Sequence, residues 1–336
     1  MTDGHPRFLL VRLGALGDVV HAMPAAAALR RAHPDARIDW LVDPRYAELV
    51  GLLTTLDRVL PIDPRGRRRD LLAGLGSLRA VDYDAAVDLQ GLVKSAVLAR
   101  ASRARRVIGF PRAHLREPMA RALYTETRDP GERPHVVHQN LALVSALGAT
   151  TTRVEFPLRE VPTPRAVEVL ERPDERFALL NPGAAWPNKR WPPSRFGEVA
   201  AALRDRRQMR SLVLWGPGEE SLAAEVAANS TGAATVLPPT GLIDILGLAR
   251  AARLMVSGDT GPLHLAGAVG TPLVALFGPT RPERNGPWEA ADVTVSRLDR
   301  CACHYERRCR LATPCIDDIG VDEVMAAIEA RLGSHA

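Results

Sequence analysis

The sequence is poor in cysteine and contains no long apolar run. Its four cysteines all lie in one short segment, at Cys301, Cys303, Cys309 and Cys315. This clustering excludes disulfides distributed through the structure. The apolar run from Phe8 to Val11 is interrupted by Arg12 and is too short for the core of a signal peptide. Because no segment approaches the roughly 20 apolar residues of a membrane-spanning helix, we expect a cytoplasmic protein that touches a membrane only from outside.

Length and composition indicate an ordinary folded protein of two domains. The chain has 336 residues, and domains usually have about 100 to 200 residues. Apolar residues make up 46% of the chain and charged residues 25%, which is typical of a globular protein. The 44 Lys and Arg residues exceed the 39 Asp and Glu residues, which gives a net charge of +5. This excess fits an anionic partner and equally a solvated basic surface.

Strands and helices alternate along most of the chain. Phe8 to Leu13 and Ile38 to Asp43 have the character of buried strands, and the alanine-rich segment between them is helical up to Pro34. The same alternation resumes at Phe177, so the pattern predicts an α/β protein of two Rossmann-like domains. We place the domains at residues 1–155 and 177–320, a proline-rich linker at 156–176 and a closing helix at 321–336.

The first candidate site is the turn from Gly14 to Asp18, between a predicted strand and a predicted helix. Gly14 and Gly17 let the backbone approach a ligand, and the helix start offers unpaired N–H groups to an anion. The third glycine of a dinucleotide-binding fingerprint is missing. Asp18 then either caps the helix or presents a carboxylate at the end of the sheet.

The second candidate site, Ser257 to His264, repeats this arrangement in the second half of the chain. Its glycines, together with Thr260 and Gly261 at the start of a helix, form a cradle for phosphate oxygens. Asp259 would repel a diphosphate, so we expect it to order the turn or to meet sugar hydroxyls. His264 is either a ligand-binding or a structural histidine.

Two further charged side chains follow predicted strands. Lys189 lies between Trp186 and Trp191, and it could neutralise the charge that develops on a leaving diphosphate. Glu220 could accept hydrogen bonds from a ribose. For each of them the alternative is an exposed, solvated side chain.

Together these segments resemble the ADP-heptose:lipopolysaccharide heptosyltransferases, glycosyltransferase family 9. The resemblance extends over nearly the whole chain and is strongest to the type I enzymes, which add the first heptose to the inner core. Its most specific part is SGDTGPLHLAGA at 257–268 followed by FGPT at 277–280. The other matching segments are VRLGALGDVVHAMPA at 11–25, VDLQGLVKSAVLAR at 87–100, HLREP at 114–118 and WGPGEE at 215–220.

The resemblance implies a GT-B fold, in which two Rossmann-like domains face a central cleft. It implies transfer of heptose from ADP-heptose to the Kdo and lipid A inner core, with inversion and without a required cofactor. Asp18 occupies the position of the catalytic base. The residues that it assigns to the donor are Lys189 for the diphosphate, Glu220 for the ribose, and Asp259, Thr260, Gly261 and His264 for the sugar and phosphate loop. The threonine pair ahead of the lysine in type I enzymes is replaced here by Ala184-Ala185-Trp186.

Basic residues of the first domain are candidates for binding an anionic lipid-linked acceptor at the cytoplasmic face of the inner membrane. Lys94 and Arg116 lie in segments that match the family, and they suit the phosphates and carboxylates of a lipid A and Kdo acceptor. Other basic residues of this domain include two runs, Arg65, Arg67, Arg68 and Arg69, then Arg103, Arg105 and Arg106. For the first run a mobile, solvated loop is an equally good interpretation.

The cysteine-rich segment leaves two alternatives. Its four thiols could be reduced and packed together, or they could bind a structural zinc or iron, as in some autotransporter heptosyltransferases of this family. A catalytic metal is not expected, because Asp82-Tyr83-Asp84, which has the spelling of a metal-binding DxD, precedes a strand instead of following one.

The sequence is also compatible with two functions other than lipopolysaccharide synthesis. The same fold could transfer heptose to a soluble acceptor such as an aminocyclitol antibiotic precursor. A basic nucleic-acid-binding module is less favoured, since no nucleic-acid motif or interleaved aromatic pattern is present.

Overall fold

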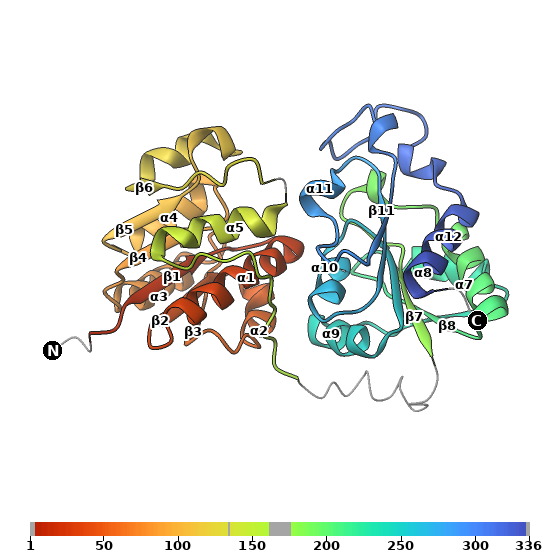
Figure 1. Ribbon diagram of the computed structural model, residues 1–336, viewed down its shortest axis with the longest axis horizontal. Helices are drawn as coiled ribbons and strands as arrows, with labels where there is room; N and C mark the ends of the chain where they lie inside the picture. Colours follow the sequence, from red (N-terminus) through yellow and green to blue (C-terminus); the bar gives the residue numbers. More distant parts are fainter. Residues whose placement is uncertain (1–3, 134, 161–175, 334–336) are drawn as a thin grey trace. The chain divides into compact units, whose positions relative to one another are not determined.

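A computed structural model describes residues 4–133, 135–160 and 176–333. The chain divides into two compact units, Met1–Glu160 and Val161–Ala336, and each contains its own parallel sheet (Figure 1). Most of the predicted linker, at 161–175, lies outside the described residues. The part that is described belongs to the first unit, where Leu158 forms an antiparallel bridge with Leu53.

The first unit is built on a six-stranded sheet in the order β3-β2-β1-β4-β5-β6. Every pairing is parallel, and β4 is buried along its whole length, as expected of a sheet covered on both faces. The strands are β1 (Arg7–Val11), β2 (Arg37–Val42), β3 (Arg58–Pro61), β4 (Ala85–Asp88), β5 (Arg106–Gly109) and β6 (Glu126–Thr127).

Most helices of this unit connect successive strands, and α5 (Val136–Val144) and η4 (Ser145–Leu147) follow the last strand, β6. Alanine-rich α1 (Leu16–Ala32) is buried without interruption from Val19 to Leu29, which explains its lack of a polar face, and it packs alongside α5 (Figure 1). The other helical segments are η1 (Pro44–Tyr46), α2 (Ala47–Val50), α3 (Arg68–Arg79), α4 (Val93–Ala101), η2 (Arg112–His114) and η3 (Pro118–Leu123).

The second unit repeats the topology of the first. Its sheet has the order β12-β11-β10-β7-β8-β9, which is the same winding read from the opposite edge, and all its pairings are parallel. Both units therefore have the strand order of a Rossmann fold. The strands are β7 (Phe177–Asn181), β8 (Arg210–Val213), β9 (Ala234–Val236), β10 (Leu254–Gly258), β11 (Leu273–Phe277) and β12 (Val293–Ser296).

Helices of the second unit cover a core of buried aliphatic side chains with Trp191 and Phe196 in edge-to-face contact at 5.0 Å between ring centroids. In the segment 321–336, where a closing helix was predicted, α12 extends over Val321–Leu332, and residues 334–336 lie outside the described residues. The helical segments are η5 (Pro187–Lys189), α7 (Pro193–Arg207), α8 (Glu220–Ala228), α9 (Leu242–Ala251), α10 (Gly261–Ala268), α11 (Pro282–Asn285), η6 (Leu298–Arg300), η7 (Cys315–Asp318) and α12 (Val321–Leu332).

The α/β prediction of two parallel sheets is confirmed, and the two candidate turns follow β1 and β10. In each sheet the winding direction reverses between two central strands, β1 and β4 in the first unit and β7 and β10 in the second. Ligands of such sheets bind at the carboxyl ends of these strands. The topology therefore places each candidate turn where its sheet is expected to bind a ligand.

Candidate active site

The carboxylate of Asp18 lies in the first turn of α1, just beyond the end of β1. Its Oδ1 atom is 2.7 Å from Nη2 of Arg12, and its Oδ2 atom accepts a hydrogen bond from the N–H of Ala15 at 3.3 Å. The side chain of Asp18 is 38% exposed, whereas that of Arg12 is 8% exposed. Asp18 thus caps the helix and also presents an accessible carboxylate, so the two sequence interpretations do not exclude each other.

Arg12 holds this carboxylate and was missed by the sequence interpretation. Its guanidinium donates through Nη1 to the carbonyl oxygen of Leu89, just after β4. Its own carbonyl accepts a hydrogen bond from Nε1 of Trp40 at 3.2 Å. Arg12 is therefore fixed between β1 and β4. The sequence feature that could have indicated its role is an arginine directly after an apolar strand.

Tyr46 packs against the turn that precedes α1. A Cβ atom on Gly14 would lie 2.8 Å from Cε2 of Tyr46, so the ring requires glycine at this position. Burial raises the pKa of Tyr46, the charge of Arg45 lowers it, and the charges of Asp43 and Asp18 raise it further. Gly17, in the first turn of α1, completes the predicted turn.

The two basic residues predicted to bind the acceptor lie on neighbouring segments of the first unit. Lys94 is exposed in the first turn of α4, and Arg116 is exposed between η2 and η3. The adjacent Glu117 accepts a hydrogen bond from the N–H of Val93 at 2.7 Å, which joins the Arg116 segment to the start of α4. The structure thus brings both cations to one region.

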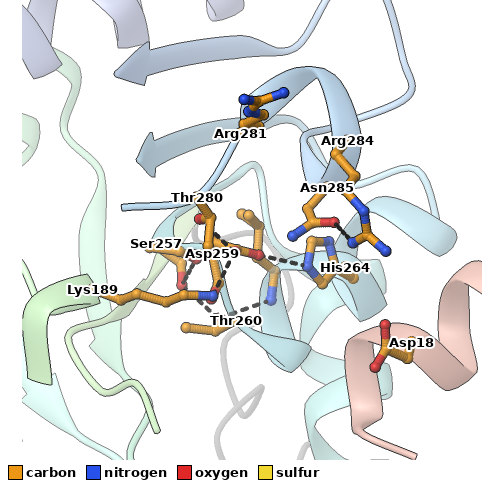
Figure 2. A network of polar contacts seen from close by, with 12 residues as sticks. Asp18, Lys189, Ser257, Asp259, Thr260, His264, Thr280, Arg281, Arg284 and Asn285 are labelled. Atoms are coloured by element: carbon orange, nitrogen blue, oxygen red, sulfur yellow. Dashed lines mark hydrogen bonds and ion pairs between the residues drawn. The ribbon is translucent and has the colours of Figure 1, made fainter. Parts of the chain in front are cut away.

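In the second unit, the buried carboxylate of Asp259 contacts three side chains (Figure 2). Its Oδ2 atom is 2.6 Å from Nζ of Lys189 and accepts a hydrogen bond from the hydroxyl of Thr280 at 2.7 Å. Its Oδ1 atom is 3.1 Å from Nε2 of His264. Asp259 therefore orders the turn, which is one of the roles expected from the sequence.

The charges around Asp259 overcome the cost of its burial. Desolvation alone would raise the pKa of this carboxyl, but the hydrogen bond from His264 and the charge of Lys189 lower it far below its ordinary value. Asp259 is consequently an anion that holds three donors in place. Its two oxygen atoms are shared among the side chains of Lys189, Thr280 and His264.

Lys189 is held from two sides. Its Nζ atom lies 4.6 Å from the ring centroid of Trp186 and also contacts the carboxylate of Asp259. Behind it, the carbonyl oxygen of Lys189 lies 2.7 Å from where a Cβ atom on Gly258 would be. The side chain of Lys189 is 14% exposed, so the surrounding residues restrict its position.

The start of α10 supplies the hydroxyl and backbone groups of the predicted phosphate cradle. The side chain of Thr260 caps the helix by accepting a hydrogen bond from the N–H of Leu263, and Gly261 is the first helical residue. Asn181, at the end of β7, donates to the hydroxyls of Ser257 and Thr260 at 2.9 and 3.1 Å. These bonds join β7 and β10 at the point where the sheet winding reverses.

The two adjacent acids Glu219 and Glu220 differ in their burial. Glu220 is exposed at the start of α8. Glu219 is 16% exposed, accepts a hydrogen bond from the N–H of Gly216 at 3.1 Å and lies 3.6 Å from Nη2 of Arg190. Its carboxylate also packs against Gly183, where any Cβ atom would collide with it. Spacing along the sequence could not choose between two adjacent acids, because the choice depends on where the first turn of α8 begins.

The four cysteines come together as free thiols. The Sγ atoms of Cys301 and Cys303 are 3.6 Å apart, and Cys309 and Cys315 pack against them. Thiolates are good ligands for zinc and iron, yet within the described residues no group of three or more His, Cys, Asp or Glu has an arrangement that could hold a metal ion. The four thiols therefore pack against one another as one cluster.

A family model for glycosyltransferase family 9 (heptosyltransferase) matches residues 73–313 of the chain. The chain belongs to this family. It is 31% identical over 321 residues to lipopolysaccharide heptosyltransferase 1 of Pseudomonas aeruginosa, a match that covers 90% of this chain and 87% of the relative. It is 27% identical over 288 residues to lipopolysaccharide heptosyltransferase 1 of Escherichia coli, covering 82% and 89%.

Solved heptosyltransferases have the same fold. The structure of the Escherichia coli heptosyltransferase WaaC with ADP-2-deoxy-2-fluoro heptose superimposes with a TM-score of 0.76 at 26% identity, covering 96% of this chain and 99% of that one. The family match and this structural similarity confirm the predicted family and the predicted GT-B fold class. The part of the chain that the structure describes has no helix long and apolar enough to cross a membrane.

Proposed function

We propose that this family 9 glycosyltransferase transfers heptose from ADP-heptose to the Kdo and lipid A inner core of lipopolysaccharide. The relatives that it matches are named lipopolysaccharide heptosyltransferases, and one solved relative holds an ADP-heptose analogue. The observation within this chain that carries the proposal is the anchored ammonium of Lys189 beside the start of α10. A fixed cation and a helix N-terminus together suit the diphosphate of a nucleotide sugar.

Asp18 acts in this proposal as the general base that removes the proton of the acceptor hydroxyl. Its exposed carboxylate is available for that proton, while Arg12 and the N–H of Ala15 hold its orientation. Direct attack of the deprotonated hydroxyl on the anomeric carbon breaks the bond to the diphosphate in one displacement. Such a displacement inverts the anomeric configuration and needs no metal.

The second unit stabilises the leaving ADP. Lys189 and the first N–H groups of α10 meet the charge that develops on the diphosphate, and Asp259 holds Lys189 in place. We assign the ribose hydroxyls to Glu219 in preference to Glu220, because Glu219 is the acid that the loops after β7 and β8 enclose. His264 and Thr260 complete the sugar and phosphate loop.

We assign acceptor binding to Lys94 and Arg116, which lie on neighbouring segments and are exposed. Ammonium and guanidinium groups suit the phosphates and carboxylates of an anionic lipid-linked saccharide. Such an acceptor would bring the enzyme to the cytoplasmic face of the inner membrane as a peripheral protein. A soluble acceptor such as an aminocyclitol precursor is the alternative, whereas family membership favours an enzyme over a nucleic-acid-binding module.

A direct assay tests this function. Purified protein, treated with EDTA and incubated with ADP-heptose and Kdo-lipid A, should yield a product heavier by one heptose, with inverted anomeric configuration by NMR. Modification of an aminocyclitol with no reaction on Kdo-lipid A would favour the alternative acceptor. Loss of transfer after EDTA, restored by a divalent cation, would contradict catalysis without a metal.

Elemental analysis of the same protein separates the two states of the cysteines. Reduced, packed thiols predict an active preparation with less than about 0.1 equivalent of zinc or iron. A stoichiometric metal that is lost in Cys309→Ser would show that the thiols rearrange into a metal site.

A further inference from the structure

The segment Cys301–Cys315, which we call the cysteine loop, packs around its four cysteine side chains. Cys301, Cys303 and Cys315 are buried and Cys309 is half-buried, whereas the side chains between them are mostly exposed. These thiols form a cluster of their own, separate from the main core of the second unit. A long loop without regular structure needs internal contacts to keep its shape, and the thiols supply them.

Asn188 connects the cysteine loop to the segment that carries Lys189. Asn188 is 2% exposed. Its Nδ2 atom donates to the carbonyl oxygen of Glu306 at 2.9 Å and lies 3.6 Å from Sγ of Cys303. Its Oδ1 atom is buried without a hydrogen-bond partner among the described residues. Because an unsatisfied buried acceptor is unfavourable, packing alone would favour an apolar residue here, so the bond to the cysteine loop is the contribution that explains asparagine.

The position of Asn188 determines the position of Lys189, its neighbour in η5. The carbonyl oxygen of Asn188 lies 3.2 Å from where a Cβ atom on Gly278 would be, and Sγ of Cys315 lies 3.5 Å from the same point. The cysteine loop also binds the segment on either side of Thr280, because the N–H of Tyr305 donates to the carbonyl oxygen of Pro279 at 3.0 Å. The loop thus supports from behind two of the three groups that meet on Asp259.

We propose that Asn188 is a positioning residue that couples the packed thiols of the cysteine loop to Lys189, and so sets the affinity of the second unit for the diphosphate of its nucleotide-sugar donor. This inference rests on the proposed function. Asn188 itself does not touch the donor, and its effect passes through the ammonium of Lys189.

Binding of ADP to the full-length protein, measured by calorimetry, tests the coupling in a double-mutant cycle. Asn188→Leu keeps the branched shape of the side chain but removes the bond to Glu306, and it should weaken ADP binding about tenfold. In a Lys189→Met background, Asn188→Leu should cause less than about a twofold further loss, because the group through which it acts is gone. A purely structural role would instead produce the full loss in both backgrounds.

Asn140→Leu is the matched control. Asn140 is also a buried asparagine, 1% exposed, which donates to one backbone carbonyl, that of His21, and has an Oδ1 atom without a partner among the described residues. It lies in the first unit, so its replacement should leave ADP affinity unchanged. If Asn188→Leu does not fold, Cys303→Ala removes the sulfur that contacts Asn188, and it should show the same dependence on Lys189.

Three results would overturn the inference. Unchanged ADP binding in folded Asn188→Leu, or an equal loss with and without Lys189, would show that Asn188 does not act through the lysine while leaving the proposed function intact. Wild-type protein that binds no ADP would overturn the proposed function and this inference together.

Discussion

Two aspartates at equivalent turns serve different purposes because their burial differs. Asp18 keeps 38% of its side chain exposed and has one strong partner, Arg12. Asp259 keeps 6% exposed and has Lys189, Thr280 and His264 as partners. A carboxylate that is open to solvent can take a proton, whereas one that is enclosed by cations can only organise them.

Asp18→Asn should lower kcat by about 10² to 10⁴ fold, since the amide keeps the shape and can still bond to the helix start but cannot accept the proton. ADP affinity and the melting temperature should stay close to those of wild type. Asp82→Asn is the control, because Asp82 is an exposed aspartate outside the site, and it should retain full activity. Wild-type turnover by Asp18→Asn would remove Asp18 as the base.

Asp259→Asn should destabilise the second unit by about 3 to 5 kcal/mol, since it leaves Lys189 and His264 without their anion in a buried position. Urea unfolding followed by tryptophan fluorescence measures this, because Trp186, Trp191, Trp215 and Trp288 all lie in the second unit. The control Asp205→Asn removes an exposed partner of Arg204 and should not change stability measurably. Equal midpoints for both variants would contradict the structural role of Asp259.

At the scale of elements, both units use a parallel strand, a short turn and a helix start at the point where the winding of the sheet reverses. The first turn is packed by Tyr46 and the second by the backbone of Lys189. The second contact is the closer one, and it places the lysine beside α10.

Gly258→Ala therefore should weaken ADP binding by about tenfold or more, because the new Cβ atom would lie 2.7 Å from the carbonyl oxygen of Lys189 and would displace the lysine. Gly76→Ala in α3 is the contrasting case, since nothing lies within 4 Å of its Cβ position. That variant should bind ADP normally and should be more stable by about 0.5 to 1 kcal/mol. Normal ADP binding by Gly258→Ala would mean that the Lys189 segment adapts without loss.

For the molecule as a whole, the ion network of Asp259 makes stability depend on pH in acid. The pKa of Asp259 in the folded protein lies below the ordinary value of about 3.9 for an unfolded chain. The folded state thus binds this proton less well, so the stabilisation is complete above about pH 4 and is lost as the pH falls through the lower, folded pKa. Between pH 7 and 5, Asp259 should contribute no slope.

The difference in unfolding free energy between wild type and Asp259→Asn should accordingly be constant from pH 7 to 5 and should shrink by up to about 1.4 kcal/mol per pH unit below pH 4. Urea unfolding at a series of pH values measures it. A difference that stays constant down to pH 3 would show that Asp259 is not the group responsible.

Much of this protein could be predicted from its sequence because the relevant signals are local. Strand and helix alternation, the glycine turns at Gly14 and Gly258 and the closing helix depend on residues near one another in the chain. Strands β5, β6 and β12 were missed, since they are short and partly exposed and carry little apolar pattern of their own. They are held by pairing with neighbours that are already in place.

The sequence by itself determined the fold class, the family and the two turns that carry Asp18 and Asp259. Only the tertiary structure decided what surrounds those residues. Arg12 reaches Asp18, Thr280 reaches Asp259, Glu219 is enclosed beside Arg190, and Asn188 joins the cysteine loop to the segment that carries Lys189. The physical reason is that burial and hydrogen-bond partners come from segments far apart in the chain, whereas sequence patterns report only what each segment does alone.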